Sequence, residues 1–144
     1  MLKVSTGLRN AMMVTGSMKS QLDNGFIKIY RGTIPLDADA SVNDADRLVT
    51  ISLNSTATGL TINTVATNGT ATKATGTWSG LNILTDTASF WRFVSSTDTG
   101  VSSTTQPRLQ GNATTAGGEL VMTSLSIISG GTTNIDFFSV NLPA

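Results

Sequence analysis

The sequence predicts an all-β protein, a jelly-roll-like β-sandwich of eight or nine short strands with a short helical segment at its N-terminus. Thr and Ser supply 24 and 16 of the 144 residues, and the β-branched Thr side chain favours strands. From residue 25 onward, apolar residues alternate with polar ones in short runs bounded by turn residues, which is typical of sandwiches and jelly rolls. A hydrophobic content of 39% distinguishes the chain from disordered Ser/Thr-rich tracts.

Residues 5–23 have a different period, because apolar side chains recur there at helical spacing, at positions 8, 12, 18 and 22. Ser5 or Thr6 is suited to cap the start of a helix, and Asn24-Gly25 is suited to end it. Gly16 predicts a break into two short helices, with Thr15 or Ser17 as the second cap. We therefore divide the chain into an N-terminal helical arm, residues 1–24, and a β-sandwich domain, residues 25–144.

The strands are expected in order along the rest of the chain. Residues 26–30 and 47–53 alternate clearly, and 59–63 is a shorter candidate. Asn68-Gly69 is a hairpin dipeptide that would pair 61–66 with 70–75. Further strands are expected at 86–95, 108–110, 119–128 and 134–142. In the last of these, simple alternation places Ile135 and Phe137 opposite Phe138, Val140 and Leu142.

Composition excludes several functions. The chain has no His and no Cys, so Ser-His-Asp and Cys-His catalytic sites and Cys/His zinc sites are impossible. Nine basic residues balance nine acidic ones, which argues against nucleic acid as a partner. No apolar run approaches the ~20 residues of a membrane span, and no signal-peptide core is visible. We expect no cofactor, no metal, no membrane partner, and synthesis in a cytoplasm.

Two motifs allow a chemical interpretation. Asp98-Thr99-Gly100 resembles the tripeptide of aspartic proteases, which need a second carboxylate, here from a second copy. The alternative is a loop in which Asp98 caps its own turn, and we favour it, so no enzyme activity is expected. The acidic stretch 37–46 alternates oxygen ligands but lacks the Gly and closing Glu of a helix–loop–helix calcium site, so it is interpreted as a solvated loop.

Six residues are candidates for protein contacts. Four of the five Met residues lie between positions 1 and 18, and flexible Met side chains suit adaptable contacts. Trp78 lies between glycines, where an exposed ring could anchor an interface or stack on a sugar. The alternative for each is packing in the chain's own core. The candidates are Leu8, Met12, Met13, Met18, Leu22 and Trp78.

The order of segments resembles a family of small tailed-bacteriophage and prophage virion proteins. The resemblance spans nearly the whole chain and is carried by LKVSTGLRNAM (2–12), GFIKIY (25–30), GTWSG (76–80), FWRF (90–93), DTG (98–100), TQPR (105–108) and IDFF (135–138). It implies a head decoration, or cement, protein on the capsid surface, bound to the major capsid protein and to itself as a dimer or trimer. A tail- or fibre-associated protein and a carbohydrate-binding module for host attachment are the alternatives. The resemblance implies no catalytic residues.

Overall fold

In the computed structural model, which describes residues 1–141, most strands join one curled antiparallel sheet. Its order is β1-β8-β7-β2-β3-β5-β11-β4, with β9 also paired to β11, and β10 and β6 form a separate two-stranded ribbon. The strands are β1 (Lys3–Val4), β2 (Phe26–Tyr30), β3 (Arg47–Leu53), β4 (Thr70–Thr72), β5 (Trp78–Leu81), β6 (Asp86–Thr87), β7 (Phe90–Val94), β8 (Arg108–Asn112), β9 (Leu120–Met122), β10 (Ser126–Ile127) and β11 (Thr132–Asn141).

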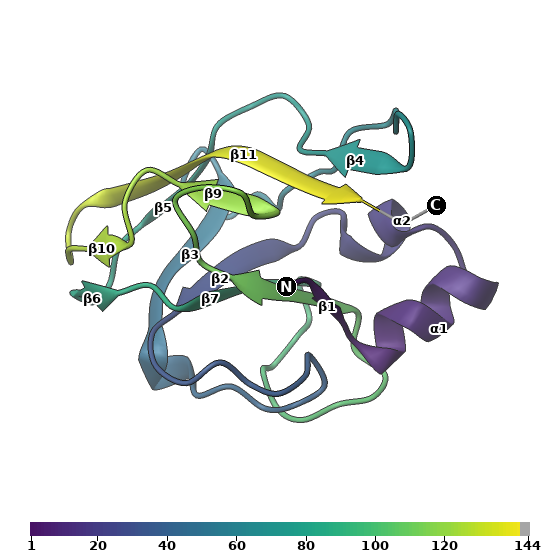
Figure 1. Ribbon diagram of the computed structural model, residues 1–144, viewed down its shortest axis with the longest axis horizontal. Coiled ribbons are helices and arrows are strands. Elements are labelled where there is room, and N and C mark those ends of the chain that lie inside the picture. The colour runs from purple at the N-terminus through teal and green to yellow at the C-terminus, as the bar shows by residue number, and fades with distance from the viewer. Residues whose placement is uncertain (142–144) are drawn as a thin grey trace.

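The sheet curls into a half-barrel. Figure 1 shows β4 and β11 above and β1, β2 and β7 below, with the seven-residue β3 rising between the two layers. The mostly-β prediction is confirmed. The finer prediction of a jelly-roll sandwich is not confirmed, because the strand pairing joins both layers into one sheet.

The helical prediction for the N-terminus is confirmed, including the break. The helix α1 (Thr6–Val14) begins after Ser5, whose side chain accepts a hydrogen bond from the Leu8 N–H, and α2 (Met18–Leu22) begins after Ser17 in the same way. Asn24 follows with a φ of 62°, the left-handed conformation that ends helices. A short 3-10 turn, η1 (Asp44–Asp46), leads into β3.

The N-terminal segment is built into the domain. Its strand β1 pairs with β8, Lys3 opposite Gln110 and Val4 opposite Leu109. Leu8 and Leu22 are fully buried in the same core as the sheet residues. In Figure 1 both helices lie at one end of the curled sheet. Residues 1–24 therefore complete the core, because the apolar helix positions 8 and 22 close the end that the strands leave open.

The strands predicted at 26–30 and 47–53 are confirmed at those bounds. The turn at Asn68-Gly69 is also confirmed, since both residues have positive φ, 51° and 75°. The predicted strand at 59–63 is wrong, because it makes only isolated bridges at Leu60 and Ile62. Residues 86–95 and 119–128 each divide into two strands.

The alternation predicted for β11 is wrong. The pairing with β9 shifts register between Ile135 and Phe137, and such a bulge changes which side chains face inward. Ile135, Phe138 and Val140 are all buried, whereas Phe137 is 49% exposed. Leu142, the last residue of the predicted alternation, lies outside the described residues.

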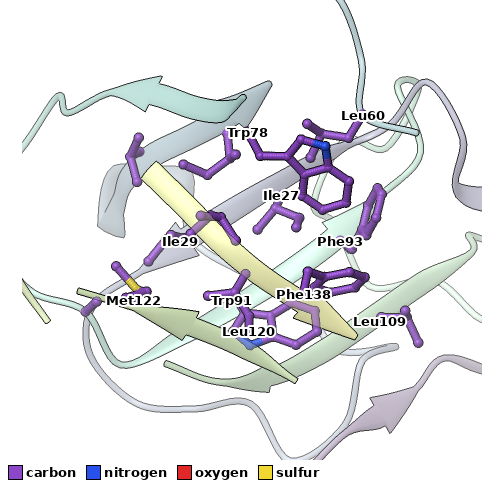
Figure 2. Packing of buried hydrophobic residues seen from close by; sticks show 14 of the residues in the cluster. Ile27, Ile29, Leu60, Trp78, Trp91, Phe93, Leu109, Leu120, Met122 and Phe138 are labelled. Atoms are coloured by element: carbon purple, nitrogen blue, oxygen red, sulfur yellow. The ribbon is translucent and has the colours of Figure 1, made fainter. Parts of the chain in front are cut away.

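Aromatic rings fill the centre of the curled sheet. Phe138 lies 5.4–5.7 Å, centroid to centroid, from Trp78, Trp91 and Phe93, in edge or tilted arrangements that suit the ring quadrupoles. Figure 2 shows these rings with Ile27, Ile29, Leu60, Leu109, Leu120 and Met122 around them. Gly111 on β8 allows this packing, because a Cβ there would lie 2.5 Å from Cζ2 of Trp91.

Candidate functional site

An apolar hollow of about 400 Å³ opens where α1 meets β1 and the ends of β8 and β11. A second hollow of about 390 Å³ continues from it toward the hairpin at 62–71. We call the two together the methionine groove, because Met12 and Met18 line both. The first hollow is lined by Leu2, Val4, Arg9, Met12, Met13, Met18, Leu109 and Val140.

The sequence produces this groove locally. Leu8 and Met12 are four residues apart on α1 and so share one helix face. Leu8 is buried, whereas Met12 lies one turn farther along and is only partly covered by the core. Leu2, just before β1, and Val4, on β1, both line the groove, because residues two apart in an extended chain share a face. The groove is therefore the uncovered continuation of the core at the N-terminal helices.

Two consecutive apolar side chains on α1 are highly exposed: Met13, which lines the groove, and Val14. Met13 is 83% exposed and Val14 is 86% exposed. A monomeric surface does contain single exposed apolar residues. Met13, however, belongs to the lining of the first hollow, which is almost wholly apolar, and a contiguous patch of that kind is typical of a protein contact.

The charges at the groove are basic. Arg9 is its only charged lining residue in the first hollow, and Lys19 lines the second. Lys19 is paired with Asp23 and also donates to the Ile62 carbonyl at 2.7 Å. Arg9 donates to the Thr6 hydroxyl at 3.0 Å, and within residues 1–141 no carboxylate forms an ion pair with it. The Thr6 hydroxyl in turn donates to Asp39, so Arg9 reaches a carboxylate only through a hydroxyl and not by a direct ion pair.

The structure brings three of the six candidate contact residues together. Met12, Met13 and Met18 all line the groove. Leu8 and Leu22 are fully buried, so their assignment to a contact surface is wrong: both helices turn these side chains into the core. Trp78 is likewise 1% exposed, because β5 points it at Phe93 and Phe138. A buried ring cannot stack on a sugar, so the carbohydrate site at Trp78 is excluded.

Apart from the groove, two buried arginines, Arg92 and Arg108, form a polar cluster on the opposite face of the sheet. Arg108 is fully buried and pairs with Asp98 through Nε and Nη2. It also donates to the carbonyls of Val101, Ala38 and Asp39, at 2.7, 3.3 and 3.4 Å. The pair and its carbonyl acceptors satisfy a charge that would otherwise be very costly to bury.

Arg92, on the neighbouring strand, has no carboxylate partner among residues 1–141. It donates to Gln110 Oε1 at 2.8 Å, to the Ala40 carbonyl at 2.7 Å and to the Asp37 carbonyl at 3.1 Å. Burial, with the adjacent Arg108 charge, lowers the pKa of Arg92 to about 10. Arg92 is thus a buried cation held by neutral acceptors.

These side chains fix the loop at residues 35–40 against the sheet. Gln110 Nε2 and Lys3 Nζ both donate to the Pro35 carbonyl, at 2.9 and 3.0 Å. Asp39 accepts from the backbone and hydroxyl of Thr6 and so joins the loop to the start of α1. The acidic stretch is therefore partly structural. Asp39 accepts hydrogen bonds from the first residue of α1, and the carbonyls of the loop accept hydrogen bonds from the two buried arginines.

The two buried arginines were not predicted, although the sequence contains a signal of them. Arg92 stands in an apolar strand, Phe90-Trp91-Arg92-Phe93, and Arg108 begins a mixed one, Arg108-Leu109-Gln110. A charged residue at a strand position flanked by large apolar residues is rarely buried without a partner. The neighbouring register of β7 and β8 places Arg92 opposite Gln110.

The loop interpretation of Asp98-Thr99-Gly100 is supported by geometry. Asp98 Oδ1 accepts from the Gly100 N–H at 2.6 Å, and Gly100 has a φ of 79°. Both carboxylate oxygens also accept from Arg108. The Asp98 carboxylate is thus engaged within its own chain rather than presented to a second copy.

Within residues 1–141, no three acidic, His or Cys side chains converge as metal ligands would. Among the described helices, none has the length and apolar character needed to cross a membrane.

The chain matches no family model, no curated protein and no solved structure.

Proposed function

We propose that this protein is a bacteriophage structural protein that decorates the capsid, and that the methionine groove is the surface through which it contacts other subunits. The observation that carries the proposal is the groove itself. It is an apolar hollow, and one of its lining residues, Met13, is 83% exposed. Apolar surface of this kind is stabilised when another protein covers it.

The composition supports the same role. A decoration protein needs contact area rather than reactive groups. The 40 Ser and Thr residues and the zero net charge give a surface suited to uncharged hydrogen bonds, which salt screens much less than ion pairs. Methionines suit a groove whose partner surface is repeated with small differences around a lattice, because their side chains adapt.

The proposed partners are the major capsid protein and further copies of this chain, and the proposed location is the virion, at the capsid surface. The sequence resemblance to virion proteins supports the location in the virion, and the groove supports the assignment of the contact surface. The proposal involves no catalytic step, nucleic acid or membrane. A tail- or fibre-associated location is the second candidate on the same resemblance and uses the same surface.

The test is the location and copy number of the protein in purified particles produced by a host that carries the gene. Quantitative mass spectrometry should give a copy number that is a fixed multiple of the capsid lattice positions, and immunogold labelling should mark heads. A small copy number with label on tails would favour the tail location. Absence from particles would overturn the proposal.

A further inference from the structure

A large apolar side chain is exposed on a loop that buried side chains hold against the sheet. Leu36 is 88% exposed. On either side of it, the Pro35 carbonyl accepts from Gln110 and Lys3, and the Asp37 carbonyl accepts from Arg92. Gln110 and Arg92 are buried. A loop fixed by buried donors holds its exposed residue in one place, which lowers the entropy lost when that residue enters a partner's pocket.

The Leu36 loop (residues 35–40) and the methionine groove lie on opposite sides of one strand. Lys3 reaches from β1 to the Pro35 carbonyl at 3.0 Å. Its two neighbours, Leu2 and Val4, line the groove. β1 is the first strand in the sheet order and pairs only with β8. A projecting apolar residue and an apolar hollow therefore flank the same sheet edge.

The charges on the two sides are complementary. Asp37, next to Leu36, uses Oδ1 to accept from the Ala40 N–H at 2.8 Å. Arg9 lines the groove. Within the part of the chain that the structure describes, neither Asp37 nor Arg9 takes part in an ion pair. An acid beside the projecting residue and a base beside the hollow would meet if Leu36 of one copy entered the groove of another.

We propose that a second copy of this chain occupies the groove, with Leu36 inserted among Met12, Met13 and Met18 and Asp37 paired with Arg9. The contact is reciprocal. Because both halves flank β1, a two-fold axis at this edge lets each copy give Leu36 and receive it, as in an isologous dimer. This inference rests on the proposed function for its use of the groove, and it names the partner as the protein itself.

The first experiment measures mass in solution by sedimentation equilibrium over a range of concentrations. The wild type should be a dimer. Leu36→Ser should raise the dimer dissociation constant at least roughly a hundredfold, because the reciprocal contact loses two buried apolar side chains, one from each copy. Leu81→Ser is the matched control, since Leu81 is exposed on β5, away from this edge, and it should leave the constant unchanged.

The second experiment exchanges the charges. Asp37→Arg and Arg9→Asp should each weaken the dimer roughly tenfold, because each brings like charges together. The double variant Asp37→Arg/Arg9→Asp should restore dimerisation. Asp136→Arg, on exposed β11 surface, controls for a change in net charge. Thermal unfolding of each variant separates loss of folding from loss of contact.

A monomeric wild type, or failure of a folded double variant to regain the dimer, would overturn this inference. Loss of the self-contact can be distinguished from loss of particle binding. If the wild type is monomeric but Met13→Asp still removes it from particles, the groove binds the capsid protein and the proposed function stands. A dimer that is absent from particles would confirm the self-contact and overturn the proposed function.

Discussion

The two faces of the sheet around β7 and β8 are stabilised in opposite ways. The inner face presents Trp91, Phe93 and Leu109 to the aromatic core. The outer face presents Arg92 and Arg108, which hold the loops at 35–40 and 98–101. Figure 1 shows two long loops below this part of the sheet. All five residues of β7 are buried as a result.

Burial in this protein therefore has two origins, which respond to different kinds of substitution. Apolar packing tolerates changes that conserve volume. A buried ion pair is sensitive to the loss of one partner, because the other is then left buried and charged. The inner face should therefore respond to changes in size, and the outer face to changes in charge.

The largest effect is expected on the outer face. Arg108→Leu leaves the Asp98 carboxylate buried without its cation and releases the carbonyls of residues 38, 39 and 101. It should lower the free energy of unfolding by about 3–5 kcal/mol, measured by urea denaturation. The control is Arg31→Leu. Arg31 is likewise ion-paired, with Asp46 and Asp86, but it lies at the surface. Equal losses for the two variants would show that burial of the pair is unimportant.

On the inner face, Phe138→Ala removes the ring at the centre of the aromatic cluster. It should lower the free energy of unfolding by about 3–4 kcal/mol, as for other large-to-small core changes. The adjacent Phe137→Ala should change it by less than about 1 kcal/mol, because that ring is half exposed. Similar losses at both positions would contradict the bulge that turns Phe138 inward and Phe137 outward.

Tyr30 gives a smaller, pH-dependent effect. Burial, with a contribution from Asp44, raises its pKa to about 12. In the unfolded chain the Tyr30 hydroxyl ionises near pH 10. Between pH 10 and 12 the unfolded state therefore binds fewer protons than the folded state, and the free energy of unfolding falls as pH rises. The loss should approach about 2–3 kcal/mol at pH 12. Tyr30 is the single Tyr, so absorbance at the tyrosinate band titrates it alone; a folded midpoint near pH 10 would contradict the prediction.

The smallest effect is expected at the methionine groove. Met13→Ser should change the free energy of unfolding by no more than about 0.5 kcal/mol, since the side chain is mostly exposed. Urea denaturation checks this. A loss comparable with that of Phe138→Ala would mean that Met13 supports the fold, and its proposed contact role would fail.

Much of the inner face could be predicted from the sequence. Alternation located β2 and β3 at their bounds, and helical spacing located α1 and α2 with their caps. The bulge in β11 could not be predicted, because period-two alternation carries no sign of an inserted residue. The division of 119–128 into two strands was missed because its two halves pair with different partners: β9 pairs with β11, whereas β10 pairs with β6, far earlier in the chain.

The candidate site was predicted in part. The clustering of methionines near the N-terminus indicated Met12, Met13 and Met18, because their number there is unusual. Leu8 and Leu22 share the same helical period and could not be separated from them, since spacing identifies an apolar face but not how far the core extends along it. Deleting residues 1–24, the simplest test from sequence alone, would remove β1 and two core residues, so point variants of the groove are the better test.

The most direct test of the central claim, that the methionine groove binds other subunits, is to compare wild type and Met13→Asp in purified particles. The claim predicts that the folded variant is lost from particles in which the wild type is present at high, fixed copy number. Retention of the variant at the wild-type copy number would contradict it.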